Sequence, residues 1–245
     1  MLKVDYNSIS KVYDQVREEE IEELHSLLHG IEICEGTTIL DIGCGTGNYT
    51  NLMERITGAK VYGLDASEGM LSKAKEKNSN ITFVLGDACN LPFEDNYFSF
   101  IYMTDVIHHI QDINKMFYEI FRVLQTGGRV CIVTQSHKQI DLRYTSEFFP
   151  ETAIIDKQRY PDIEEIIFNA EKNKLRLVDV IVIGEGKEIE VGKEYIELVE
   201  KKGYSMLHLI SDDNYQSGLR KIRSEIAMGS IKRKSAGASL VWFKK

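Results

Sequence analysis

The chain has 245 residues, of which 43% are hydrophobic and 28% charged, as is ordinary for a soluble globular protein. Its formal net charge of −8 argues against a dedicated nucleic-acid binder, because such proteins usually carry a basic face. No apolar run is long enough to span a bilayer and residues 1–5 do not begin a signal peptide, so we expect a cytoplasmic protein without membrane contact.

The four cysteines indicate neither a zinc ribbon nor a thioredoxin-like site. Cys34, Cys44, Cys89 and Cys131 form no C-x-x-C pair, and their use suits a reducing compartment. We expect no metal site, and the sequence does not indicate an oligomeric state.

Residues 39–133 switch repeatedly between short apolar runs and helical spacing, which is typical of a parallel sheet with crossover helices. Strands are predicted at residues 38–42, 60–64, 81–85, 98–103, 129–134, 175–183 and 238–243. The pattern predicts an α/β protein with a doubly wound, mostly parallel seven-stranded sheet.

Helices are predicted around this sheet. An amphipathic helix ends near Gly30, and another begins near Asn48. Between the fourth and fifth strands, six apolar residues fall on one helix face. They are Ile113, Met116, Phe117, Ile120, Phe121 and Leu124. We expect Gly127 and Gly128 to end that helix, and Pro161 to occupy the first turn of a later one.

The domain organisation follows from where this pattern loosens. We expect residues 1–245 to form a single domain. Its core would comprise about residues 36–135, 161–183 and 238–245. Its helical lid insertions would comprise about residues 1–30, 136–160 and 184–237.

The most informative segment is residues 39–47, ILDIGCGTG, a buried strand followed by a glycine-rich turn. Glycines allow positive φ and a close approach of ligand to main chain, and N–H groups at the next helix start can hold polar ligand groups. This arrangement describes a nucleotide-binding crevice. The G-x-G-x-G spacing is one residue shorter than the dinucleotide fingerprint, and Asp41 lies two residues before the first glycine.

Two further acids close the next two predicted strands. Asp65 closes the second strand, where an acid can accept hydrogen bonds from ribose hydroxyls. Asp87 closes the third. Three acids at three successive strand ends specify a site better than a glycine loop alone, although each could instead cap the following helix or turn.

These features resemble the class I S-adenosylmethionine-dependent methyltransferases, in particular small-molecule members of the methyltransferase type 11-like group. The loop with Asp41 resembles motif I, and residues 65–70, DASEGM, resemble the family's D-x-S-x-x-M. Residues 122–128, RVLQTGG, resemble its R-V-L-K-P-G-G turn, with Gln125 and Thr126 replacing Lys and Pro. The resemblance covers about residues 6–134 and implies a Rossmann-like methyltransferase fold.

The resemblance also implies a cofactor, S-adenosyl-L-methionine, and its product S-adenosyl-L-homocysteine. Asp41 would help to hold the methionine ammonium, Asp87 would accept from the adenine amino group, and Ala66 and Met70 would flank adenine. The residues expected to contact the cofactor are Tyr13, Arg17, Asp41, Gly43, Cys44, Gly45, Asp65, Ala66, Met70, Asp87, Ala88 and Thr104.

Residues 6–17, YNSISKVYDQVR, look like an N-terminal segment common in small-molecule members of the family. By this resemblance Tyr13 and Arg17 close over the cofactor, and Arg17 pairs with the methionine carboxylate. A surface helix with an ordinary arginine is the alternative.

The catalytic candidates are His108 and His109, which follow the fourth strand within residues 104–110, TDVIHHI. A sulfonium methyl is already activated, so the enzyme mainly holds the acceptor in line and excludes water. A histidine could serve as general base if the acceptor arrives protonated, with a structural or cofactor-contacting role as the alternative. Asp105 is expected to be a cap or turn residue.

The predicted lid contains many aromatic side chains, and two interpretations stay open for them. They could line an acceptor pocket or form a secondary core. They include Tyr144, Phe148, Phe149, Tyr195, Tyr204, His208 and Tyr215, and the non-aromatic Met206 lies among them.

The leading functional hypothesis is methyl transfer by in-line displacement to O, N or C of a small-molecule acceptor. An RNA or protein methyltransferase is a second hypothesis, supported only by a basic cluster that the acidic net charge weighs against. That cluster comprises Arg220, Lys221, Arg223, Lys232, Arg233 and Lys234. An NAD(P)-dependent Rossmann oxidoreductase is a third, which the glycine spacing and Asp87 oppose. A non-catalytic cofactor-binding regulator is a fourth.

Overall fold

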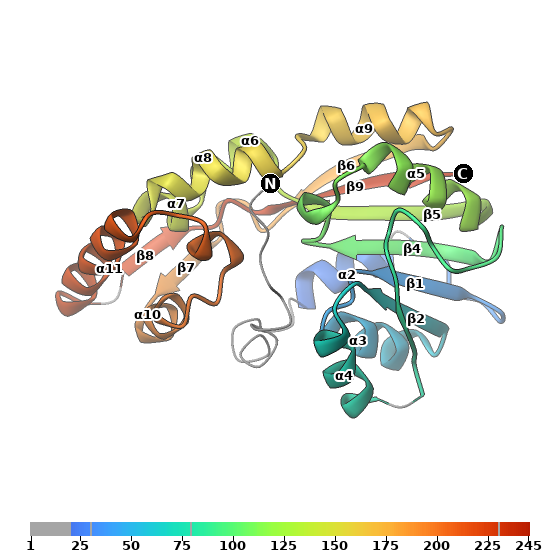
Figure 1. Cartoon of the computed structure of the whole chain (residues 1–245), viewed down its shortest axis with the longest axis horizontal. Helices are drawn as coiled ribbons and strands as arrows, with labels where there is room; N and C mark the ends of the chain where they lie inside the picture. The colour runs from blue at the N-terminus through green and yellow to red at the C-terminus, as the bar shows by residue number, and fades with distance from the viewer. Residues whose placement is uncertain (1–20, 30, 79, 230) are drawn as a thin grey trace.

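The computed structural model describes residues 21–245 except residues 30, 79 and 230, and it shows two lobes side by side (Figure 1). One lobe contains a large sheet with helices on both faces. We call the other the helical lobe and define it as residues 137–159 and 184–237. Within the described part of the chain, no helix has both the length and the apolar character needed to cross a membrane.

The large sheet has seven strands in the order β3-β2-β1-β4-β5-β9-β6. The pairs that β9 forms with β5 and β6 are antiparallel, and the pairs among β1 to β5 are parallel. The strands are β1 Thr38–Ile42, β2 Lys60–Asp65, β3 Thr82–Leu85, β4 Phe98–Thr104, β5 Leu124–Thr134, β6 Arg176–Ile183 and β9 Ala238–Lys244. The predicted doubly wound fold is confirmed. The strand order reverses between β1 and β4, and ligands of such sheets bind beyond the strand ends at this switch point.

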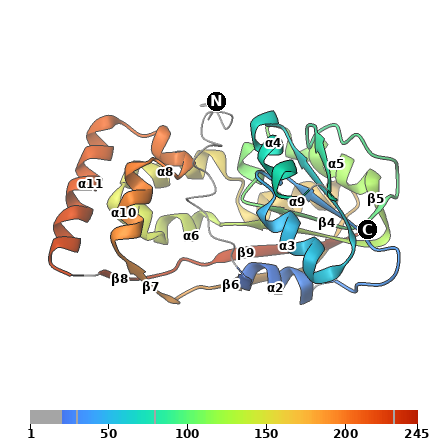
Figure 2. The same ribbon diagram turned by 90° about the horizontal axis from the view of Figure 1, so that it is seen from below.

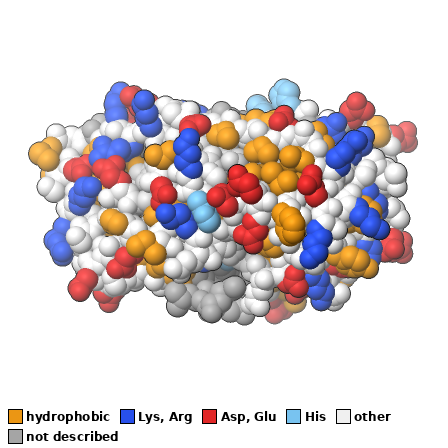
Figure 3. Space-filling model, turned by 90° about the horizontal axis from the view of Figure 1, so that it is seen from above, with side chains coloured by type: hydrophobic (Ala, Val, Ile, Leu, Met, Phe, Trp, Pro, Cys, Tyr) orange, Lys and Arg blue, Asp and Glu red, His pale blue; other side chains and the backbone are white. Residues whose placement is uncertain are grey.

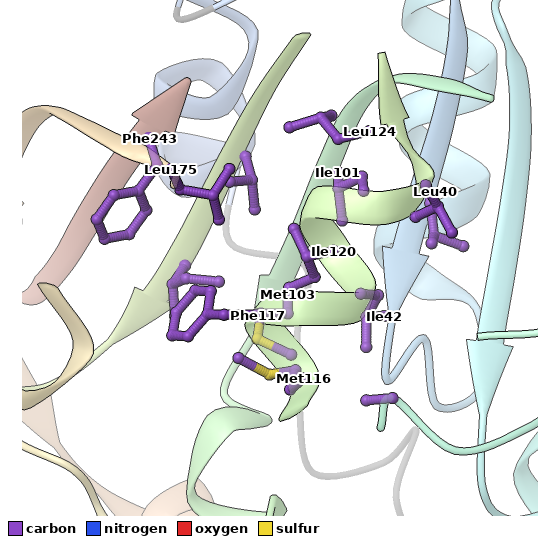
Figure 4. Packing of buried hydrophobic residues seen from close by; sticks show 14 of the residues in the cluster. Leu40, Ile42, Ile101, Met103, Met116, Phe117, Ile120, Leu124, Leu175 and Phe243 are labelled. Atoms are coloured by element: carbon purple, nitrogen blue, oxygen red, sulfur yellow. The ribbon is translucent and has the colours of Figure 1, made fainter. Parts of the chain in front are cut away.

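Helices cover both faces because each carries one apolar stripe. α5 (Ile113–Val123) and α9 (Ile163–Lys172) pack on one face, where Phe117 and Ile120 lie against the sheet residues drawn in Figure 4. α2 (Ile21–His29) and α3 (Asn48–Thr57) contribute residues to the apolar cluster on the other face. Both helices are labelled in Figure 2. α4 (Glu68–Lys77) packs near β2 and β3.

Two turn predictions were wrong. α5 already ends at Val123, and β5 begins at Leu124, so Gly127 and Gly128 lie inside the bounds of β5. Phe98 pairs with Leu124 whereas Phe100 pairs with Arg129, so the intervening residues bulge from the ladder.

Pro161 does not lie in the first turn of α9. Asp162 is the N-cap, and its carboxylate accepts a hydrogen bond from the N–H of Ile163. Pro161 therefore precedes the helix, because a capping carboxylate next to it determines where the helix begins.

The helical lobe has its own apolar core. Its elements are α6 His137–Leu142, α7 Tyr144–Phe148, α8 Pro150–Arg159, β7 Glu188–Val191, α10 Lys193–Glu200, η2 Ser205–His208, α11 Asp212–Ala227 and β8 Ile231–Lys234. Phe148, Phe149, Tyr195 and Tyr215 are buried together in this core. Most of the predicted lid aromatics thus form a secondary core, and the antiparallel pair β7–β8 was not predicted.

Gly218 allows helix α11 to pack closely against Phe148 and Phe149 within the helical lobe. A Cβ at this position would lie 2.2 and 2.3 Å from ring atoms of Phe149 and 2.7 Å from the carbonyl oxygen of Phe148. Glycine is therefore required here for close packing, against its usual cost of about 1 kcal/mol inside a helix.

We expect Gly218→Ala to lower the free energy of unfolding by about 1–3 kcal/mol, because overpacking outweighs the gain in helix propensity. Chemical denaturation measures the change. The exposed neighbour Ser217 provides the control, since Ser217→Ala should leave stability nearly unchanged. A Gly218→Ala variant more stable than the wild type would contradict the packing described here.

Candidate active site

The glycine loop between β1 and α3 is fastened to the end of β2. The N–H groups of Gly43 and Cys44 both donate to the carbonyl oxygen of Leu64, at 2.7 and 3.0 Å. Gly43, Gly45 and Gly47 have φ angles of 77°, 55° and 79°, which only glycine adopts readily. The loop therefore follows a path that this glycine spacing is needed to produce.

The loop also contacts the turn after β4. A Cβ on Gly43 would lie 2.3 Å from Cγ2 of Val106, so the absent side chain makes room for that valine. The thiol of Cys44 points into a small apolar cluster that includes Phe83, and burial raises its pKa well above the ordinary value. Only the backbone of Cys44 is thus suited to meet a ligand.

Asp41 is buried at the end of β1. Its Oδ2 accepts a hydrogen bond of 2.7 Å from Thr50 in α3, whereas its buried Oδ1 accepts none from the described residues. Tyr102, its register partner on β4, is also buried. Burial raises the pKa of Asp41 to about 7, and the neighbouring Thr50 and Tyr102 hydroxyls only partly oppose this rise. A nearby cation would favour the ionised carboxylate.

Asp65 is bound to the glycine loop. Its Oδ2 accepts from the N–H of Gly45, and its Oδ1 from the N–H of Ser67, both at 2.8 Å. Burial raises the pKa of Asp65, and these two backbone hydrogen bonds oppose the rise. Each carboxylate oxygen has a second lone pair, so Asp65 can cap the turn and still accept from a ligand hydroxyl.

Asp87 is exposed after β3, and its Oδ1 accepts from the N–H of Cys89. Among the other predicted contacts, Ala66 is exposed, Thr104 is half-buried, and Met70 and Ala88 are buried. Ala88 belongs to the main apolar core, so its side chain is committed to packing.

His108 and His109 lie in a short 3-10 helix, Ile107–His109, that follows β4. Their ring centroids are 4.0 Å apart, and His108 also stacks on Tyr160 with centroids 4.0 Å apart and an interplanar angle of 8°. Asp105, which begins this turn, has a φ of 53°. Asp105 is therefore a turn residue, as predicted, in a conformation that aspartate tolerates better than most residues.

Tyr13 and Arg17 lie outside the described residues. Thr50, Tyr102 and Tyr160 were not predicted as site residues. Aligning the ends of neighbouring strands would have found Tyr102, because it pairs with Asp41. The sequence carries no comparable signal for Tyr160, which reaches His108 from the end of α8.

Residues 40–132 match the family model Methyltransf_11, described as a methyltransferase domain. The demethylmenaquinone methyltransferase of Staphylococcus aureus is 29% identical over 183 residues, which cover 67% of this chain and 76% of that protein.

Two solved structures share the fold. A protein of Anabaena variabilis, described as a methyltransferase from an antibiotic biosynthesis pathway, superposes with a TM-score of 0.77 at 21% identity. The match covers 94% of this chain and 100% of that one. Phosphoethanolamine N-methyltransferase 2 of Haemonchus contortus, in complex with S-adenosyl-L-methionine, superposes with a TM-score of 0.60 at 23% identity. The match covers 98% of this chain and 59% of that one.

We expect Asp41→Asn to stabilise the unliganded protein increasingly as pH rises. A folded-state pKa of about 7 lies above the ordinary 3.8, so ionisation of Asp41 opposes folding. The resulting loss of stability is absent below pH 3.8, grows as the pH rises from 3.8 to about 7, and is complete above about pH 7. The amide variant avoids this loss, worth up to about 4 kcal/mol, and keeps an oxygen for Thr50.

Urea unfolding of both proteins from about pH 5 to about pH 8 measures this difference. The free energy of unfolding of Asp41→Asn, minus that of the wild type, should increase across this range. A difference that stays constant with pH would show that Asp41 titrates as an ordinary exposed carboxyl.

Proposed function

We propose that this chain, which is a class I S-adenosylmethionine-dependent methyltransferase, transfers a methyl group to an oxygen, nitrogen or carbon atom of a small-molecule acceptor. The observation that carries this proposal is the meeting of Asp41, the glycine loop and Asp65 at the ends of two neighbouring strands, with loop and acid joined by the hydrogen bond from Gly45.

The residues at this edge fit the cofactor. The Oδ1 of Asp41 accepts no hydrogen bond from the described residues. It suits the methionine ammonium, because a carboxylate binds a cation more strongly than it binds a neutral group. Asp65 suits the ribose hydroxyls and Asp87 the adenine amino group. The cofactor, when bound, supplies an activated methyl on a sulfonium.

The contribution of the chain is then to hold the acceptor in line and to exclude water. His108 and His109 follow β4 at the switch point, where we propose that the acceptor binds. Either imidazole could take a proton from an acceptor that arrives protonated. We propose that the helical lobe forms the lid over this region. Of the N-terminal lid segment expected from the sequence, α2 packs instead on the sheet, and residues 1–20 lie outside the described part of the chain.

Two observations support a small-molecule acceptor. The relatives described above are named for small acceptors, demethylmenaquinone and phosphoethanolamine. The basic cluster near the end of the chain is also largely neutralised. Lys221 and Arg233 pair with Glu147, Arg223 with Glu200, and Lys232 with Glu188. Figure 3 likewise shows basic side chains interspersed with acidic ones. Paired charges attract nucleic acid weakly.

Two measurements test the proposal. Titration calorimetry should give binding heat with S-adenosylhomocysteine and none with NAD. A methyl-transfer assay with labelled cofactor should then label small molecules in a metabolite extract but not RNA or protein. Binding of NAD alone would contradict the cofactor, and label in RNA or protein would contradict the acceptor class.

We expect Asp87→Ala to weaken S-adenosylhomocysteine binding about 3- to 10-fold, the value of one hydrogen bond. Asp95→Ala is the matched control, because Asp95 is an exposed carboxylate paired with Arg122 and should leave the affinity unchanged. Equal affinities of the two variants in calorimetry would remove Asp87 from the cofactor site.

A further inference from the structure

Tyr160 joins the helical lobe to the 3-10 helix Ile107–His109, which carries the two histidines. It follows the last residue of α8, and its ring lies parallel to that of His108, with centroids 4.0 Å apart. Both side chains are buried, at 9% and 6% exposure. A buried parallel stack of this kind restricts the rotation of an imidazole about its side-chain bonds.

Arg143 holds Tyr160 in turn. Its guanidinium lies 5.2 Å from the centre of the Tyr160 ring, within cation–π range. Arg143 is itself nearly buried. It donates a hydrogen bond of 2.7 Å to the Asp156 carboxylate and one of 2.5 Å to the side-chain oxygen of Gln135. Asp156 also accepts from Arg159 at 3.0 Å. Tyr160 therefore contacts both His108 and an arginine that two hydrogen bonds keep in place.

The same region ties together the chain crossings between the two lobes. The chain enters the helical lobe at His137 and leaves it at Tyr160. The Nε2 atom of His137 lies 2.9 Å from the carbonyl oxygen of Tyr160. Gln135 donates a hydrogen bond to the carbonyl oxygen of Gly237, where the chain returns from the helical lobe to the sheet for the second time. The position of the lobe and the orientation of His108 are thus linked by direct contacts.

We propose that Tyr160 and Arg143 are positioning residues for methyl transfer, because they hold His108 in one orientation relative to the helical lobe. This inference rests on the proposed function, in which the lobe helps to enclose the acceptor. Neither residue needs to touch the acceptor, since each acts through the imidazole. Loss of the stack should lower kcat rather than cofactor affinity, because the acceptor and its neighbouring groups would lose alignment.

Three variants of the full chain test the proposal. Tyr160→Leu removes the ring and should lower kcat about 10²-fold, with S-adenosylhomocysteine affinity unchanged. Tyr160→Phe keeps the ring and should restore most of the activity. Phe168→Leu is the control for the same kind of change, because Phe168 is 66% exposed on the neighbouring helix α9.

A spectroscopic readout separates positioning from a general structural effect. The His108 ring protons should be shifted by the Tyr160 ring current in the wild type and in Tyr160→Phe, and should lose that shift in Tyr160→Leu. His108→Gln identifies the signal in the NMR spectrum. If Tyr160→Leu does not fold, Arg143→Lys tests the same link, because it keeps the charge but loses the planar fork, and kcat should again fall.

The outcomes can be told apart. Lack of any methyl transfer by a wild-type protein that binds S-adenosylhomocysteine would contradict the proposed function. Equal kcat values for the leucine and phenylalanine variants, with wild-type transfer intact, would overturn only the positioning inference. A His108 signal insensitive to loss of the Tyr160 ring would also overturn it.

Discussion

The N–H groups of Gly43 and Cys44 share one acceptor, the carbonyl oxygen of Leu64 at the end of β2. Because two donors meet one oxygen, the turn after β1 cannot shift without loosening the neighbouring strand. The next amide, that of Gly45, binds the carboxylate of Asp65. Hydrogen bonds within the chain therefore hold together the loop and the acid that we propose for the cofactor, and such preorganisation lowers the entropy cost of binding.

Features that oppose stability gather at this same edge of the sheet. Asp41 is a buried ionisable group with one oxygen that accepts from none of the residues the structure describes, and Asp105 adopts a left-handed backbone conformation. Such features persist where the surrounding structure determines them, and they cluster at functional sites. Here β1 and β4 supply that surrounding structure, since each contributes buried residues to both cores that flank the sheet.

The sheet was predictable from the sequence because its signals are local. A buried parallel strand is a short apolar run, and the acids that close β1, β2 and β3 stand within or directly after such runs. The positive φ angles of Gly43, Gly45 and Gly47 agree with the predicted turn. The cofactor roles given to these residues stay predictions, as do those of the histidines.

The helical lobe was far less predictable because contacts distant in sequence hold it together. Glu147 in α7 pairs with Arg233 in β8, and Glu151 accepts from Ser211. An aromatic residue such as Tyr195 has the same local pattern whether it lines a pocket or packs in a core. The bulge in β5 was missed for a related reason, since the register of Phe98 and Phe100 with a neighbouring strand determines it.

Each of the two insertions that build the helical lobe leaves the sheet and re-enters it at neighbouring points. The N–H of His137 donates to Asp162 at the ends of one insertion, and Ile183 pairs with Ala238 at the ends of the other. Segments anchored in this way can change length and sequence during evolution while the strands keep their register. A lineage with this architecture can therefore diversify its chemistry by exchanging whole insertions, with no need to redesign the sheet.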